Sequence, residues 1–227
     1  MARPLGSTRN KPMLKYKSAE FYDGPVLKMA DAIRSRDHHI LRTLVISQAH
    51  SVNSTGQKGF PILGWAMGHN DLRAAEILLK AGANPNVTFP FGERKMSLIS
   101  LAVSTENAGF LNLLLANGAS PAGVVGTEPP LFSAVKANPY DRIPCLLKAG
   151  ADINQQDAAG KTAIVMMALG GDYSQTLAFV KAGADPRIPM KNGSTLEKII
   201  KKFPAQIGTA QQTAQTELMA LLRTTPR

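Results

Sequence analysis

The stretch "LLKAGANPN" at residues 78–86 returns three more times along the chain. The later copies read "LLANGASPA" at 114–122, "LLKAGADIN" at 146–154 and "FVKAGADPR" at 179–187. Their glycines follow one another at intervals of 36, 32 and 33 residues. A recurring period of this length is typical of proteins built from repeated supersecondary units. The pattern therefore indicates a repeat protein.

Each copy describes the end of a helix followed by a turn. Two large apolar residues, such as Leu78 and Leu79, close an amphipathic helix, and a glycine follows at the left-handed position where a helix stops. Eleven residues before three of the glycines stands an Asp or Asn, residues that favour the N-cap of a helix. The predicted caps are Asp71, Asn107 and Asp172, with Asp141 in the third copy.

A shorter apolar helix is expected before each of these helices, at 60–68, 96–104, 128–136 and 161–169. Each begins with a large apolar residue that should face the core. A second core position follows four residues later and is small in three of the copies, which allows close helix packing. The first set is Ile62, Leu98, Leu131 and Ile164, and the second is Ala66, Ala102, Val135 and Ala168.

The chain resembles the ankyrin repeat over about residues 23–200. The fourth copy matches that motif best, with Gly160, Thr162 and Ile164 followed by Gly183-Ala184-Asp185. The family's usual histidine in the first helix is replaced by apolar residues, namely Leu63, Ile99, Phe132 and Val165. The resemblance implies an all-α ankyrin-repeat solenoid with short, hairpin-like finger loops, and the missing histidines imply more reliance on apolar packing.

Terminal repeats of such arrays are usually atypical. We expect a basic arm over 1–22, an N-terminal capping repeat over 23–56, four ankyrin repeats over 57–190 and C-terminal capping helices over 191–227. The capping residues predicted to point inward are Ala30, Ile33, Ile40, Leu41, Leu44, Val45, Leu218, Leu221 and Leu222.

The composition favours a packed domain with basic ends. The chain is 44% hydrophobic and 19% charged, which is enough to build a core. The chain has a net charge of +10. Residues 1–50 contribute +5 and residues 181–227 contribute +5, and the residues between them are neutral overall. Nucleic-acid grooves usually carry a basic stripe through the body of the domain, so nucleic acid is not the expected partner.

A polyanion or an anionic membrane bound by the basic ends remains the alternative partner. The residues that would bind it are Lys11, Lys15, Lys17, Arg34, Arg36, Lys198, Lys201 and Lys202. The sequence has no apolar run of the roughly 18 residues that a membrane span needs. It also has no apolar signal-peptide segment, so we expect a cytoplasmic protein, or a periplasmic one if a leader has been removed.

The tripeptide Gly160-Lys161-Thr162 also ends the phosphate-binding loop of many nucleotide hydrolases. That loop requires a glycine five residues before Gly160, where this chain has Gln155. The four histidines show no metal-binding spacing, and His38 and His39 are expected on a solvated helix surface. Cys145 sits among apolar residues and should be inert. We therefore expect no catalytic residue, metal or cofactor, and a non-enzymatic protein.

The resemblance implies that another protein binds the concave side formed by the shorter helices and the fingers. Aromatic and Arg side chains are enriched at interface centres, which singles out the first finger. One of its two phenylalanines, Phe89 and Phe91, can instead pack on the neighbouring repeat. The finger candidates are Thr88, Phe89, Phe91, Arg94, Lys95, Val124, Val125, Gln155, Gln156, Asp157, Arg187 and Lys191.

Further candidates lie one turn into the shorter helices, at Met67, Val103, Lys136 and Leu169. Trp65 stands where a small residue is usual, so we expect it to pack, with its indole N–H at the surface. By analogy with small bacterial ankyrin proteins, a finer hypothesis is an immunity protein that binds and neutralises a toxic effector enzyme.

Overall fold

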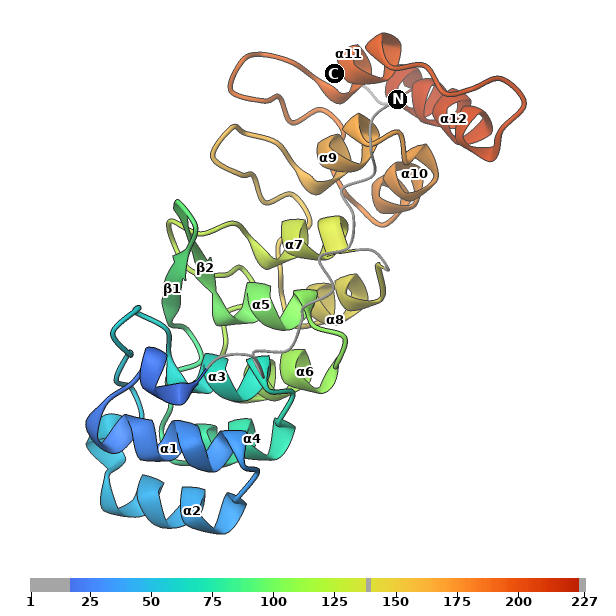
Figure 1. Ribbon diagram of the computed structural model, residues 1–227. Helices are drawn as coiled ribbons and strands as arrows, with labels where there is room; N and C mark the ends of the chain where they lie inside the picture. Colours follow the sequence, from blue (N-terminus) through green and yellow to red (C-terminus); the bar gives the residue numbers. More distant parts are fainter. Residues whose placement is uncertain (1–16, 138–139, 225–227) are drawn as a thin grey trace. The chain divides into compact units, whose positions relative to one another are not determined.

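The computed structural model describes residues 17–137 and 140–224 of the chain. Helices dominate it, and they follow one another in antiparallel pairs (Figure 1). The chain divides into two compact units, Met1–Glu128 and Pro129–Arg227, which are described separately.

The first unit holds three helix pairs. They are α1 (Gly24–Arg34) with α2 (His38–Ser47), α3 (Ile62–Gly68) with α4 (Leu72–Lys80), and α5 (Leu98–Ser104) with α6 (Gly109–Ala116). Helix α1 packs on α3, α2 on α4, and α4 on α6, so successive pairs stack (Figure 1). Short 3-10 helices occupy Ser18–Glu20 and Ala49–Ser51, and strands β1 (Thr88–Phe91) and β2 (Arg94–Ser97) form a hairpin before α5.

The second unit repeats this plan. Its pairs are α7 (Pro130–Ala137) with α8 (Ile143–Lys148), α9 (Ala163–Leu169) with α10 (Tyr173–Lys181), and α11 (Leu196–Lys202) with α12 (Ala210–Thr224). A 3-10 helix at Tyr140–Arg142 leads into α8. Helix α7 packs on α9, α9 on α11, and α10 on α12. The predicted helix–turn–helix repeat is confirmed, and the C-terminal cap is itself one such pair.

Burial follows the sequence period. The first predicted core residue of each short helix is at most 1% exposed, as at Ile62 and Ile164. The four apolar residues that replace the usual histidine are at most 2% exposed, so they contribute packing in its place. Trp65 is fully buried, and its indole Nε1–H donates to the Ala30 carbonyl oxygen at 3.2 Å. The expectation that this N–H reaches the surface is therefore wrong.

Two of the four predicted helix caps, Asp71 and Asp172, are confirmed: they accept from the Ala74 N–H at 3.0 Å and the Gln175 N–H at 3.1 Å. The N-cap of α6 is Ala108 instead of Asn107, whose side chain one residue earlier accepts from the Gly109 N–H at 2.9 Å. Asp141 is wrong as a cap. The chain is already helical there, because the 3-10 helix runs into α8, and the Asp141 carboxylate pairs with Arg142 at 2.6 Å.

The N-terminal cap differs from the sequence-based expectation at two points. Ile40 is 49% exposed, whereas Leu41 and Val45 on the same helix are buried. The expected arm ends before residue 22, because Phe21 and Tyr22 are buried with ring centroids 5.2 and 5.5 Å from that of Trp65. The part of the predicted arm at 1–16, with Lys11 and Lys15, lies outside the described residues.

Asparagine side chains tie neighbouring turns together. Asn53 donates to the Gly82 carbonyl oxygen at 2.9 Å and accepts from the Asn84 N–H at 2.7 Å. Such paired bonds from one planar amide fix both the spacing and the register of two turns. Asn86 repeats the arrangement with Gly118 and Ser120, and Asn154 accepts from Asp185. Ala122 holds the equivalent place in the turn before the unit boundary, and its side chain has no amide group.

Candidate partner-binding surface

The first finger is a β-hairpin with a tight turn. Strands β1 and β2 are antiparallel, with Phe91 opposite Arg94. Gly92 has a φ of 61°, and a positive φ at the first central residue suits a two-residue hairpin turn. The sequence predicted a long finger loop here. The structure shows that this loop is a regular antiparallel hairpin.

The base of the hairpin is anchored by Phe89. This ring is 3% exposed and meets Phe60 edge-on, with centroids 4.8 Å apart. The preceding loop also approaches closely, since a Cβ on Gly59 would lie 3.0 Å from Pro90 Cδ. Phe89 is therefore a packing residue, and its prediction as a partner-binding residue is wrong.

The tip of the hairpin carries an exposed aromatic ring beside cations. Strand residues alternate between faces, so Phe91 shares a face with Phe89 two residues earlier. Unlike Phe89, Phe91 is 60% exposed. Arg94, opposite Phe91, is exposed on the same face, whereas Lys95, opposite Pro90, is exposed on the other face; Thr88 at the base is half-buried.

The next turn adds to this exposed group. Val125 is fully exposed and Val124 is half-buried. The beginning of that turn is held to the hairpin's base by the two hydrogen bonds of Asn86. Four exposed side chains of the first unit thus belong to two connected turns. We name this set the finger surface; it comprises Phe91, Arg94, Lys95 and Val125.

Two residues predicted on the shorter helices are not available to a partner. Met67 and Val103 are 3% and 2% exposed, respectively, because α3 and α5 bury most of their side chains. Lys136 and Leu169 occupy the equivalent places on α7 and α9 and are exposed. The position predicted for binding is therefore exposed only in the second unit.

The polar candidates in the finger turn between α8 and α9 make hydrogen bonds that stabilise this turn. The Gln156 amide donates to the carbonyl oxygens of Gly160 and Pro189 at 2.7 and 3.0 Å. The Asp157 carboxylate accepts from the Ala159 and Lys161 N–H groups, both at 2.8 Å. These side chains hold two neighbouring turns in place, and Gln155 beside them is half-buried.

In the fourth turn, Arg187 pairs with Asp185 at 2.9 Å. The hydrogen bond from this guanidinium holds the pKa of the Asp185 carboxyl below its usual range. Lys191 is exposed, and its backbone N–H donates to the Ala159 carbonyl oxygen at 3.1 Å. Arg187 and Lys191 thus remain exposed candidates, with Arg187 already neutralised by its neighbour.

The tripeptide Gly160-Lys161-Thr162 forms a turn and a helix start. Gly160 has a φ of 78°, and Thr162 is the N-cap of α9. Among the described residues, no group of three His, Cys, Asp or Glu side chains is placed to hold a metal ion. Cys145 is half-buried on α8. In the same part of the chain, no helix is long and apolar enough to cross a membrane.

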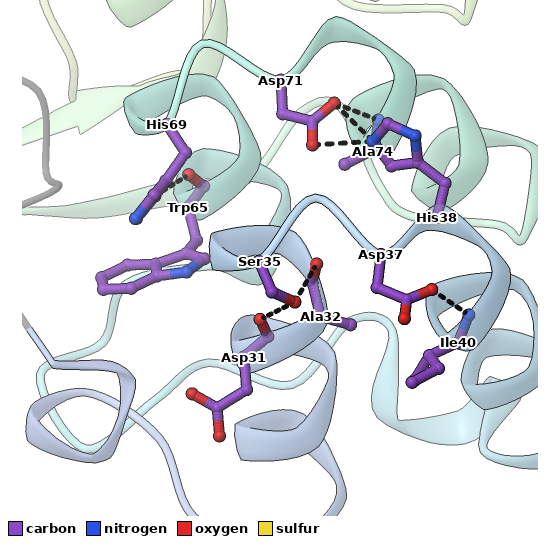
Figure 2. Close-up of polar contacts among 10 residues, drawn as sticks. All are labelled: Asp31, Ala32, Ser35, Asp37, His38, Ile40, Trp65, His69, Asp71 and Ala74. Atoms are coloured by element: carbon purple, nitrogen blue, oxygen red, sulfur yellow. Dashed lines mark hydrogen bonds and ion pairs between the residues drawn. The ribbon is translucent and has the colours of Figure 1, made fainter.

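Sequence reasoning missed a polar contact between two repeats. His38 is half-buried, and its Nε2 lies 2.8 Å from Oδ2 of Asp71, which also caps α4 (Figure 2). Tyr140 makes the matching contact in the second unit, donating to Asp172 Oδ2 at 2.7 Å. His38 stands 33 residues before Asp71, so a search for polar pairs one period apart would have found it.

His69 is the buried histidine of the first unit. It is 4% exposed, its ring lies against Trp65, and its Nδ1 is 3.0 Å from the Trp65 carbonyl oxygen (Figure 2). Within residues 17–137 and 140–224, its Nε2 has no hydrogen-bond partner. Burial lowers the pKa of His69, and the nearby Arg34 and Arg36 add to this, while the Trp65 carbonyl and Asp71 oppose it.

We predict a pH dependence of stability from His69. Because its folded pKa lies below the unfolded value, the unfolded state takes up a proton first, so stability should fall as the pH drops below about 6.5. Urea unfolding measures the free energy of unfolding at pH 8 and at pH 5.5. The decrease between the two pH values should be smaller for His69→Gln than for the native chain. The uptake of one proton can change the free energy of unfolding by at most about 1.4 kcal/mol per pH unit. The exposed His50→Gln is the control; equal losses in both variants would contradict the prediction.

Comparison with known proteins shows which proteins this chain resembles. No family model matches the chain. Ankyrin repeat and SOCS box protein 6 from Homo sapiens and from Pongo abelii are each 29% identical over 144 residues, covering 55% of this chain and 31% of theirs. The chain thus spans about a third of the length of these curated relatives.

Two solved structures resemble almost the whole chain. An ankyrin repeat domain from Acinetobacter baumannii matches with a TM-score of 0.67 and 22% identity, covering 85% of this chain and 96% of that one. A chain from the Bdellovibrio bacteriovorus predatory endopeptidase in complex with an immunity protein matches with a TM-score of 0.65 and 20% identity, covering 84% and 97%. The chain has the ankyrin-repeat fold.

Proposed function

We propose that this chain is a non-enzymatic module that binds a partner protein through the finger surface. The exposed Phe91 ring on an anchored hairpin carries the proposal. Phe89 and the close contact at Gly59 fix the base of the hairpin, so little ordering entropy is lost when its tip is covered. Arg94 beside Phe91, together with Lys95 on the other face of the hairpin, gives the tip a charge that favours an acidic rim on the partner.

The finer form of the proposal is an immunity role, in which the partner is a toxic effector enzyme. A structural neighbour from a complex of an endopeptidase with an immunity protein supports it. The net charge of +10 also suits an acidic partner. A pull-down with the native chain followed by mass spectrometry would identify the partner, and capture of a secreted enzyme is the expected result.

Replacing Phe91 and Arg94 together with Ala should weaken partner binding by at least about tenfold. Exposed aromatic and Arg side chains at an interface centre often contribute 2 kcal/mol or more, where about 1.4 kcal/mol corresponds to a factor of ten. The melting temperature should not change, because both side chains lie outside the core. Isothermal titration calorimetry with the captured partner measures the affinity.

Two controls test whether the finger surface itself carries the binding. Phe89→Ala should lower the melting temperature through lost packing, whereas the Phe91 variant should not. Binding that falls by orders of magnitude between 50 and 200 mM salt would favour the alternative, a polyanion held by the basic residues. Unchanged affinity of the double variant would contradict the proposal.

A further inference from the structure

A groove of about 410 Å³ opens on the second unit, at the C-terminal end of α9. It lies between the α9–α10 turn and the α11–α12 turn. The finger surface belongs to the other unit, so the groove is a separate feature of the molecule. The lining residues used below are Leu169, Gly170, Tyr173, Phe203, Gln206 and Gln211.

The groove exists because one turn is longer than its counterparts. Residues 203–209 join α11 to α12, whereas three or four residues join the helices of the pairs α1–α2, α3–α4, α5–α6 and α9–α10. The first residues of the long turn are held by two side chains. The Tyr173 hydroxyl donates to the Phe203 carbonyl oxygen, and Gln215 Oε1 accepts from the Ala205 N–H at 2.9 Å.

The second wall is fixed as well. Gln211 Oε1, at the start of α12, accepts from the Ser174 N–H at 2.9 Å, which ties α12 to the first turn of α10. Tyr173 itself is buried. The groove is therefore bounded by groups with defined hydrogen-bond partners, and a ligand would meet a largely preformed surface.

Large apolar side chains stay exposed around this groove. Leu169 and Phe203 line it and are 42% and 43% exposed, and Ile207 on the same long turn is 86% exposed. Exposed apolar groups gathered at one place on a surface mark interaction sites. A volume of this size suits one or two large side chains of a bound segment.

The charges near the groove favour an acidic ligand. Lys202 lies with its Nζ 5.5 Å from the centre of the Phe203 ring. Asp172, in the α9–α10 turn, accepts from the Gln175 N–H and the Tyr140 hydroxyl. Over residues 181–224, each carboxylate already has a cation within ion-pair distance: Asp185 with Arg187, Glu197 with Lys201, and Glu217 with Lys181. Lys202 therefore presents positive charge at the groove that these carboxylates do not neutralise.

We propose that this groove docks an acidic, apolar segment of a partner protein. A large apolar side chain of the segment lies between Leu169 and Phe203, and a flanking carboxylate faces Lys202. The proposal does not depend on the finger surface, which would bind its partner through other residues.

An NMR titration with synthetic peptides tests this proposal. The probe is the acetylated, amidated hexapeptide EELFEE, added to the ¹⁵N-labelled native chain. The backbone signals of Gly170, Gly171 and Gln206 should shift on its addition. The double substitution Leu169→Ser and Phe203→Ser should raise the Kd at least about tenfold, because it removes the apolar contacts of one or two side chains.

Charge and composition controls use the same chain. Lys202→Glu should also weaken EELFEE binding, and the charge-reversed peptide KKLFKK should bind more weakly than EELFEE. Ile46→Ser removes an apolar side chain that is 80% exposed on α2, and it should leave binding unchanged, as should Phe91→Ala. Circular dichroism melts would verify that each variant is folded.

Three results would overturn the proposal. The first is no signal change with EELFEE at millimolar concentration. The second is equal affinity for KKLFKK, which would remove the role of charge. The third is equal affinity for EEGSEE, which would show a general polyanion surface rather than an apolar groove. Since Phe91→Ala is a control here, failure of the finger-surface proposal would be seen separately.

Discussion

Replacing Asp71 with Ala is expected to lower the free energy of unfolding of the first unit by about 2–4 kcal/mol. Its carboxylate is 3% exposed and serves two partners at once, the Ala74 N–H of its own helix and the His38 ring of the preceding repeat. The loss of a helix cap costs about 1 kcal/mol, and a hydrogen bond to a charged group contributes about 1.5–3 kcal/mol. The substitution removes both contributions.

Asp37 provides a matched control for this prediction. It caps α2 by accepting from the Ile40 N–H at 2.9 Å, and it is less buried than Asp71. Asp37→Ala should therefore cost only about 1 kcal/mol. Urea unfolding followed by the fluorescence of the single tryptophan, Trp65, reports on this unit. Equal losses in the two variants would mean that the His38 contact adds nothing.

His38→Ala isolates the contact between repeats. The cap made by Asp71 survives in this variant, so the expected loss is smaller than that of Asp71→Ala. Tyr140→Phe is the equivalent change in the second unit, because it removes only the hydroxyl that donates to Asp172. These contacts lie at the start of the longer helices and join neighbouring repeats there, as the asparagine bridges join them at the turns.

The fold was predictable because its determinants are local and recur. Glycine at the helix end, an acid at the helix start and apolar residues at fixed offsets each have a physical role within one repeat. Positions such as Ile62 and Leu98 therefore took their predicted places in the core. Asp141 failed because it lies inside the 3-10 helix Tyr140–Arg142, which no single-residue cap preference reveals.

The candidate site was less predictable because exposure depends on neighbouring repeats. Phe89 and Phe91 are chemically identical and two residues apart, and only contact with Phe60 separates a packing ring from an exposed one. Met67 and Leu169 share one position of the motif, yet only Leu169 is exposed. The groove beside Leu169 depends on the length of the 203–209 turn, which the repeat pattern does not specify.

Trp65→Ala should be the most damaging single substitution considered, with an expected loss of about 3–5 kcal/mol in the free energy of unfolding. The side chain is fully buried, and its ring meets Phe21, Tyr22 and His69. The substitution opens a large cavity and also leaves the Ala30 carbonyl oxygen without its indole donor. Since domains are stable by about 5–15 kcal/mol in total, this loss should remove a large fraction of the stability of the first unit.

Circular dichroism during urea unfolding measures this loss, because the variant has no tryptophan to report it. Trp65→Phe keeps a ring in the site and removes the N–H, so it should lose less than Trp65→Ala. Ile46→Ala, at an exposed position, should change stability by no more than about 0.5 kcal/mol. A loss below about 1 kcal/mol for Trp65→Ala would mean that Phe21 and Tyr22 do not pack on this ring in solution.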